Sequence, residues 1–168
     1  MEAAKNGLVN GMKENLFMPE KNLTRAQFAV ILYRSLGEPS VEGLENPYID
    51  LEAEWYKDAV IYMSSIGVIN GVGKGKFAPE NNITREQMVT MLYRLSKDEI
   101  SDEDLKVLDT YADQESVSEY ARVPMAWAIK NGIVNGVGKN KLNPQGLATR
   151  AQAAKVIYLF AELIKTEE

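Results

Sequence analysis

Apolar residues recur every three or four positions in three separate segments of the chain, which is the period of an amphipathic helix. In the middle segment, which starts at Thr84, the apolar face consists of Met88, Met91, Leu92 and Leu95. The corresponding faces near the two ends are Phe28, Ile31, Leu32 and Ser35, with Leu36 beside them, and Ala153, Val156, Ile157 and Phe160. No such helix can bury its face alone, so the three together predict a central helix bundle.

A second helix is expected before each of these segments, separated from it by a glycine-rich turn. From about Trp55 the middle copy places one face on Trp55, Ala59, Tyr62, Met63 and Ile66. Gly67 is expected to end the helix in a left-handed conformation. The segment "NGVGKGKFAP" has the composition of a turn, and Phe77 is its one large apolar anchor. In the third copy Pro124 is expected to start or kink the helix. The pattern therefore predicts an all-α fold of tandem helix–turn–helix repeats.

The copies are true internal repeats. "GLVNG", "GVING" and "GIVNG" begin at Gly7, Gly67 and Gly132, and the same two spacings relate the prolines, threonines, arginines, glutamines and tyrosines that follow: Pro19, Pro79 and Pro144; Thr24, Thr84 and Thr149; Arg25, Arg85 and Arg150; Gln27, Gln87 and Gln152; Tyr33, Tyr93 and Tyr158. This predicts repeats at 1–37, 48–97 and 111–165 that form one cooperative unit. The first repeat lacks most of its first helix, and "EPSVEGLENP" and "KDEISDEDLKVLD" are expected to be linkers, the second of them a solvated acidic one.

Composition narrows the function. The chain has 168 residues, 45% of them hydrophobic, which suits a globular unit. It has no cysteine and no histidine, so disulfides, thiolate or imidazole metal sites and histidine-based catalysis are excluded. The net charge of −5 with dispersed cations argues against a nucleic-acid partner. No apolar run approaches the roughly 20 residues that span a bilayer, so no membrane insertion is expected. The first residues lack the basic-then-apolar pattern of a secretory signal, and we expect any export signal to lie outside this fragment.

No pattern predicts a catalytic centre, a metal or a cofactor. Paired carboxylates for glycoside hydrolysis must face each other across a cleft. Asp50 and Asp113 recur, but each is alone in its copy near a predicted helix start, where capping the helix is the ordinary role. "GVGKGKF" lacks the spacing of a phosphate-binding loop and does not follow a strand.

The motif Thr-Arg-x-Gln opens the second helix of each repeat. Threonine with glutamine three residues later is a capping box, which accounts for both residues. It does not account for Arg25, Arg85 and Arg150, because a cation at the first helical position opposes the helix dipole. Two explanations are open. The guanidinium pairs with a carboxylate or carbonyl of a neighbouring repeat, or it completes an anion site beside free helix N–H groups.

Four further residues are candidates for ligand contact. Gly71 and Gly136 would let a sugar approach the backbone, although turn geometry alone also explains them. Trp55 and Trp127 offer aromatic faces for sugar stacking, although helical spacing among apolar residues also favours a core position.

The middle copy, "YIDLEAEWYKDAVIYMSSIGVINGVGKGKFAPENNITREQM", resembles the S-layer homology module in the order of its motifs, and three copies resemble that family's triplet. The chain departs from the family in having glutamine for the motif's final acid and a shortened first copy. The resemblance implies a pseudo-threefold, three-pronged spindle that anchors exported proteins noncovalently to the cell wall. It implies an extracellular location at the cell surface.

The resemblance also implies a ligand. The partner class is a peptidoglycan-linked secondary cell-wall polysaccharide, typically pyruvylated, and the motif arginines meet the pyruvate carboxylate in grooves between repeats. On this chain these are Arg25, Arg85 and Arg150, with Gly71, Gly136, Trp55 and Trp127 as further contacts. The alternative is a protein–protein scaffold in which the arginines only pair repeats with one another, and an enzyme is the weakest hypothesis.

Overall fold

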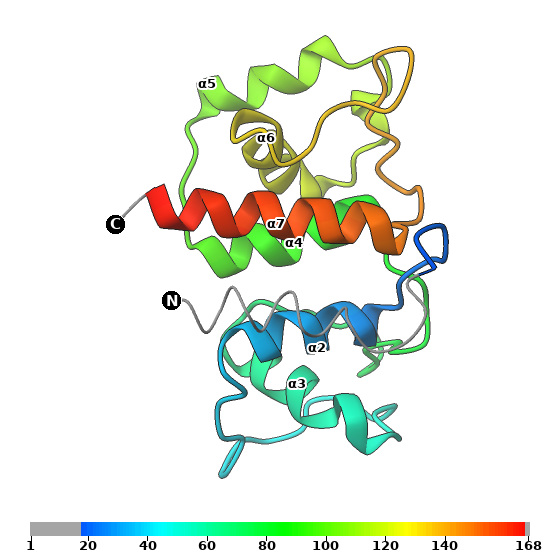
Figure 1. Cartoon of the computed structure of the whole chain (residues 1–168), viewed down its shortest axis with the longest axis vertical. Helices are drawn as coiled ribbons and strands as arrows, with labels where there is room; N and C mark the ends of the chain where they lie inside the picture. The colour runs from blue at the N-terminus through cyan, green and yellow to red at the C-terminus, as the bar shows by residue number, and fades with distance from the viewer. Residues whose placement is uncertain (1–17, 167–168) are drawn as a thin grey trace. The chain divides into compact units, whose positions relative to one another are not determined.

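The computed structural model describes residues 18–166, and this part of the chain is helical. Its α-helices are α2 (Arg25–Ser35), α3 (Glu54–Ser65), α4 (Arg85–Ser96), α5 (Asp102–Leu105), α6 (Arg122–Lys130) and α7 (Arg150–Thr166) (Figure 1). Three short 3₁₀ turns, η1 (Lys106–Thr110), η2 (Gln114–Ser116) and η3 (Glu119–Ala121), precede α6. Extended pairing in residues 18–166 is limited to isolated bridges. The all-α prediction is confirmed.

The chain divides into two compact units, Met1–Ile83 and Thr84–Glu168. In the first unit α2 packs against α3. The turn after α3 contributes Phe77, which is fully buried and whose ring centroid lies 5.6 Å from that of Tyr48. Phe77 is thus the apolar anchor that the sequence predicted, and it holds the glycine-rich turn to the core.

The apolar face predicted for α3 is partly wrong. Ala59 and Met63 are buried, but Trp55 is 55% exposed and Ile66 is 42% exposed. The residue that enters the core at the start of the helix is Tyr56, which is 2% exposed. The buried face of α3 therefore follows Tyr56, Ala59, Val60 and Met63, so the predicted face is right in its middle and wrong at its ends.

In the second unit α4 packs against α6, and α7 lies along α4 (Figure 1). Pro124 is the third residue of α6, in the first turn, where a missing N–H costs no intrahelical hydrogen bond. This confirms that the proline starts the helix. Apolar faces predicted for the Thr-Arg-x-Gln helices are largely confirmed as well: the predicted residues of α7 are all buried, whereas Leu36 and Leu95, at the ends of the other two faces, are not.

The acidic segment before the third repeat is more ordered than the solvated linker predicted for it. Ser101 caps the short helix α5 together with Asp104, and the Lys130 Nζ lies 2.9 Å from the Asp104 Oδ1. The hydrogen bond from Lys130 lowers the pKa of Asp104 to about 2. Leu108 of η1 is fully buried and ties the segment to the core beside α6. Most of its acidic side chains are exposed, as predicted for a solvated segment, but Leu108 docks it, which the prediction missed.

Some predictions stay predictions. The shortened first helix of the first repeat falls on residues 1–17, outside the described residues. The repeat boundaries 1–37, 48–97 and 111–165, the pseudo-threefold spindle and the single cooperative unit are likewise expectations from the sequence.

Candidate functional site

The three Thr-Arg-x-Gln motifs form capping boxes. In each, the threonine Oγ1 accepts a hydrogen bond from the backbone N–H of the glutamine, and the glutamine Oε1 accepts one from the threonine N–H, with donor–acceptor distances of 3.0–3.2 Å. These contacts fix the first turns of α2, α4 and α7, and therefore the position from which each arginine side chain leaves its helix.

The N–H groups beside the arginines are already occupied in α2 and α4. The N–H of Arg25 donates to the Asn81 carbonyl at 2.8 Å, and that of Arg85 donates to the Gly146 carbonyl at 2.9 Å. The next N–H in each helix donates to a proline carbonyl, that of Pro79 or of Pro144. The expectation of free N–H groups at these helix starts was therefore wrong, because the following loop of the chain satisfies them.

The Arg25 guanidinium is enclosed by the loop that contains Phe77. Arg25 is 3% exposed; its Nε donates to the Phe77 carbonyl at 2.9 Å and its Nη2 to the Asn70 carbonyl at 3.2 Å. The guanidinium carbon lies 4.6 Å from the centroid of the Phe77 ring, within the range of a cation–π contact. These contacts are the ones expected of a structural arginine.

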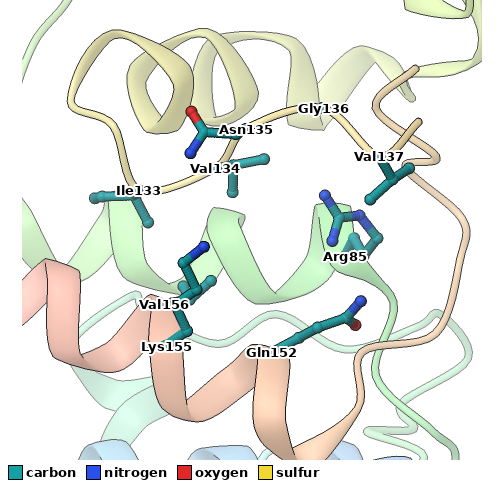
Figure 2. A pocket seen from close by; sticks show the side chains of 9 residues that line it. All are labelled: Arg85, Ile133, Val134, Asn135, Gly136, Val137, Gln152, Lys155 and Val156. Carbon is teal, nitrogen blue, oxygen red and sulfur yellow. The ribbon is translucent and has the colours of Figure 1, made fainter. Parts of the chain in front are cut away.

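The Nε of Arg85 makes a contact equivalent to that of the Arg25 Nε, but the terminal nitrogens of Arg85 have different surroundings. Its Nε donates to the Leu142 carbonyl at 2.9 Å, and Arg85 is 7% exposed. Its terminal nitrogens are directed into a cavity of about 180 Å³ (Figure 2). The cavity is lined by Arg85, Ile133, Val134, Asn135, Gly136, Val137, Gln152, Lys155 and Val156. Two of these residues are cations and none is an acid.

Asp50 and Asp113 hold the loops that receive the arginines. The Asp50 carboxylate accepts hydrogen bonds from the N–H groups of Phe77 and Ala78, and Asp113 accepts from those of Leu142 and Asn143, all at 2.7–2.9 Å. The prediction that these acids cap helices was wrong, since each binds a loop 27–30 residues further on. One residue in each loop thus links an acid to an arginine: its N–H binds the aspartate and its carbonyl binds the guanidinium.

Burial shapes the electrostatics of the cavity. It lowers the pKa of the Arg85 guanidinium, and the charge of Asp113 partly offsets this effect. Partial burial raises the pKa of Asp113, but the N–H groups of Leu142 and Asn143 stabilise the carboxylate and bring that pKa below its ordinary value. The Asp113 carboxylate is therefore occupied by its hydrogen bonds to the loop N–H groups. The cavity retains a positive charge that an anion can neutralise.

Comparison with known proteins identifies the family. The S-layer homology domain matches residues 1–29, 48–89 and 110–154 of the chain. The chain belongs to the S-layer homology domain family.

Relatives of this S-layer homology chain are large proteins. An amylopullulanase of Thermoanaerobacterium thermosulfurigenes is 35% identical over 92% of this chain and 8% of its own length. A surface-layer 125 kDa protein of Lysinibacillus sphaericus is 32% identical over 89% of this chain and 13% of its own length. A cellulosome-anchoring protein of Acetivibrio thermocellus is 28% identical over 89% of this chain and 34% of its own length. An undecaheme cytochrome from the S-layer of Carboxydothermus ferrireducens aligns structurally with a TM-score of 0.43, at 21% identity, over 88% of this chain and 22% of that protein. The chain thus spans between 8% and 34% of the length of these proteins.

The remaining predicted site residues of the S-layer homology repeats lie in different environments. Arg150 is half-buried at the start of α7 and does not line the Arg85 cavity. Trp127 is 1% exposed, and its Nε1 donates to the Asp98 Oδ2 at 2.6 Å, which favours the core alternative. Trp55 is exposed, and its ring and that of Tyr56 meet edge-on with centroids 4.9 Å apart, so Trp55 is not the core residue that helical spacing favoured.

Gly71 and Gly136 are required by packing. A Cβ on Gly71 would lie 2.6 Å from the Lys76 carbonyl oxygen and 2.8 Å from the Tyr48 ring, and one on Gly136 would lie 2.9 Å from the Tyr111 ring. Close packing thus accounts for both glycines, and neither has the positive φ that a turn would require of glycine. Gly136 also lines the Arg85 cavity, so this cavity contains two of the residues named as candidates from the sequence, Arg85 and Gly136 (Figure 2).

Sequence reasoning missed two polar residues of the cavity. Asn135 belongs to the repeated Gly-x-x-Asn-Gly motif, so its recurrence was the available signal. Lys155 has no counterpart, because the corresponding positions hold Thr90 and Val30. In residues 18–166 no helix is long and apolar enough to cross a membrane, and no three acids gather as a metal site would require.

Proposed function

We propose that the chain is a noncatalytic anchor that holds its parent protein at the cell surface by binding an anionic secondary cell-wall polysaccharide. In this proposal the Arg85 cavity receives the carboxylate of a pyruvyl ketal. The observation that carries it is the guanidinium of Arg85 facing a cavity lined by two cations and no acid. This happens in a chain of net charge −5, so the local positive field runs against the overall one.

The geometry suits a carboxylate. The bond from Nε to the Leu142 carbonyl holds the side chain in place, and the two terminal nitrogens then form a fixed planar edge. Such an edge matches the two oxygens of a carboxylate. Because a buried cation lacks water, an anion that pairs with it regains part of the lost solvation energy.

The size suits a substituent of a polymer. A cavity of about 180 Å³ is smaller than the ~300–1,000 Å³ of pockets that enclose a whole small ligand. In this proposal the cavity admits the charged group, and the amides of Asn135 and Gln152, which line it, bind hydroxyl groups of the sugar. A polysaccharide with a repeated anionic substituent is the class of ligand that fits this arrangement.

The relatives support anchoring over catalysis. A similar segment occurs in an amylopullulanase, a surface-layer protein and a cellulosome-anchoring protein, and it forms between 8% and 34% of each. A role shared by such different proteins is more readily attachment to the cell surface than a reaction. Extracellular location follows from this role.

One observation favours the scaffold alternative for part of the chain. Both Arg25 and Arg85 donate to loop carbonyls within their own units, as a purely structural arginine would. For Arg25 the structural explanation accounts for the observed contacts. For Arg85 it accounts only for Nε, and the terminal nitrogens facing the cavity are what the anchor proposal adds.

Binding to purified cell-wall sacculi tests the proposal. Arg85→Ala should weaken binding at least about tenfold, the value expected for one charged two-pronged contact. Arg85→Lys should restore it only in part, because lysine keeps the charge and loses the fork. The matched control is Arg34→Ala, which removes an exposed arginine paired with Glu38 and should leave binding unchanged.

Sacculi from which the pyruvyl groups have been removed by mild acid should bind the wild-type chain poorly. Circular dichroism of each variant at the assay temperature confirms that it is folded. Unchanged binding of a folded Arg85→Ala variant, or equal loss in Arg34→Ala, would overturn the assignment of the site.

A further inference from the structure

The Arg85 cavity contains a second cation that the repeated motif does not supply. Lys155 lies on α7 one turn after Gln152, and Figure 2 shows its amine directed toward the same space as the Arg85 terminal nitrogens. Residues three apart share a helix face, so α7 presents Gln152 and Lys155 to the cavity together.

Lys155 has no internal role that would explain it. Its side chain is exposed, and within residues 18–166 its amine makes no ion pair with a carboxylate. The corresponding residues of the other repeats, Thr90 and Val30, carry no charge. Neither the capping box nor the helix core therefore requires a lysine at this position.

Two cations in one cavity repel each other unless an anion lies between them. One carboxylate held by the Arg85 fork neutralises one charge and leaves the other. A ligand with two negative groups neutralises both, and a flexible ammonium group suits a second anionic group whose position is not fixed by a planar fork.

We propose that Lys155 is a specificity-determining residue that makes this cavity select saccharides with a second negative charge near the ketal carboxylate. The inference rests on the proposed function, in which Arg85 binds the carboxylate. The second group is an anionic substituent on the same sugar or on its neighbour, and Lys155 binds it as a point charge.

Titration calorimetry with two synthetic probes tests the inference. The first probe is a methyl hexoside with one pyruvyl ketal, and the second is the same hexoside with an added phosphate monoester. The wild-type chain should bind the phosphorylated probe about two- to fivefold more tightly, as expected for one charge pair open to solvent. This preference should shrink as salt is added.

The decisive variant is Lys155→Thr, which installs the residue of the second repeat. It should lose the preference for the phosphorylated probe, so that the variant binds the two probes with about equal affinity. Lys106→Thr is the control, because it removes the same charge from an exposed position of the same unit and should keep the preference.

The outcomes separate the two proposals. If the plain ketal binds in an Arg85-dependent way and Lys155→Thr keeps the full preference for the phosphorylated probe, this inference fails and the proposed function stands. Equal affinity of the wild type for both probes also overturns this inference alone. If the wild type binds neither probe, both proposals fail.

Discussion

The same motif arginine meets two different environments in the two units of this protein. Arg25 donates from two nitrogens to the carbonyls of Phe77 and Asn70 and lies over the Phe77 ring. Arg85 donates from Nε to Leu142 and turns its terminal nitrogens to a cavity. The same motif arginine can therefore be enclosed by a loop or face a cavity, and the residues around it decide which of the two occurs.

Two substitutions distinguish the surroundings of the two arginines. The loop residue whose carbonyl binds Nε is Phe77 in one unit and Leu142 in the other, and only the aromatic ring can cover a guanidinium. The residue after the arginine is Ala26 in α2 and Glu86 in α4. Glu86 is 4% exposed and accepts hydrogen bonds from Ser118, Tyr120 and Gln145, which fix the first turn of α4 by contacts that Ala26 cannot make.

The largest effect is expected from Arg25→Ala. It leaves the carbonyls of Phe77 and Asn70 without their donor in a buried place, so the free energy of unfolding should fall by about 3 kcal/mol. Urea unfolding measures this. Arg34→Ala, on the exposed side of the same helix, should cost less than about 0.5 kcal/mol. A stable Arg25→Ala variant would remove the contrast between the two arginines.

Asp113→Asn should have the next largest effect, about 2 kcal/mol, because a carboxylate that binds two N–H groups becomes a weaker neutral acceptor. The pKa of Asp113 is lower in the folded than in the unfolded chain, so its contribution is complete above the unfolded value of about 3.9 and is lost as the pH falls through the folded pKa. Urea unfolding of the wild type and the variant should therefore differ at pH 7 and converge at acid pH, below the folded pKa of Asp113. Asp109→Asn, at an exposed position, is the control. An equal difference at both pH values would contradict this role.

Phe77→Leu gives the first unit the loop residue of the second. The loss of ring volume and of the cation–π contact should cost about 1.5 kcal/mol. Hydrogen exchange at the Arg25 Nε should also become faster, because the ring no longer covers the guanidinium. Phe28→Leu is the control, because it removes the same volume from a fully buried ring that makes no cation–π contact in the described residues. If both variants speed the exchange equally, the ring is not what distinguishes Arg25.

The smallest effect is expected from the capping boxes. Thr149→Ala should lower the free energy of unfolding by about 1 kcal/mol through the lost bond to the Gln152 N–H. Thr149→Ser keeps the hydroxyl and should restore most of it. Thermal or urea unfolding of the pair checks the prediction, and an equal loss in both would show that the methyl group matters instead of the cap.

Local sequence rules predicted the features that depend on a few neighbouring residues. Thr84 and Gln87 define a helix start within one turn, and Gly67 defines a helix end by its left-handed backbone, with φ of 76°. The same rules failed where the partner is distant. Asp113 looks like a helix cap until the fold brings Leu142 to it, and Trp55 looks like a core residue until the exact start of α3 is known.

In the candidate site, too, some residues could be predicted from the sequence and others could not. Arg85 and Gly136 were predictable because they repeat, and the cavity brings them together. Lys155 was not, since a residue that occurs in one repeat only gives no recurrence to notice. The occupied N–H groups at the helix starts were also hidden, because the carbonyls that satisfy them come from loops dozens of residues away.

Nuclear magnetic resonance of the arginine side chains tests most directly whether Arg85 serves a ligand while Arg25 serves the fold. The pyruvyl-ketal hexoside is titrated into the wild-type chain, and the guanidinium N–H signals of both residues are followed. The terminal N–H signals of Arg85 should shift and saturate, whereas those of Arg25 should stay in place because the Phe77 loop encloses them. A hexoside that binds and shifts Arg25, or that binds without shifting Arg85, would contradict the account.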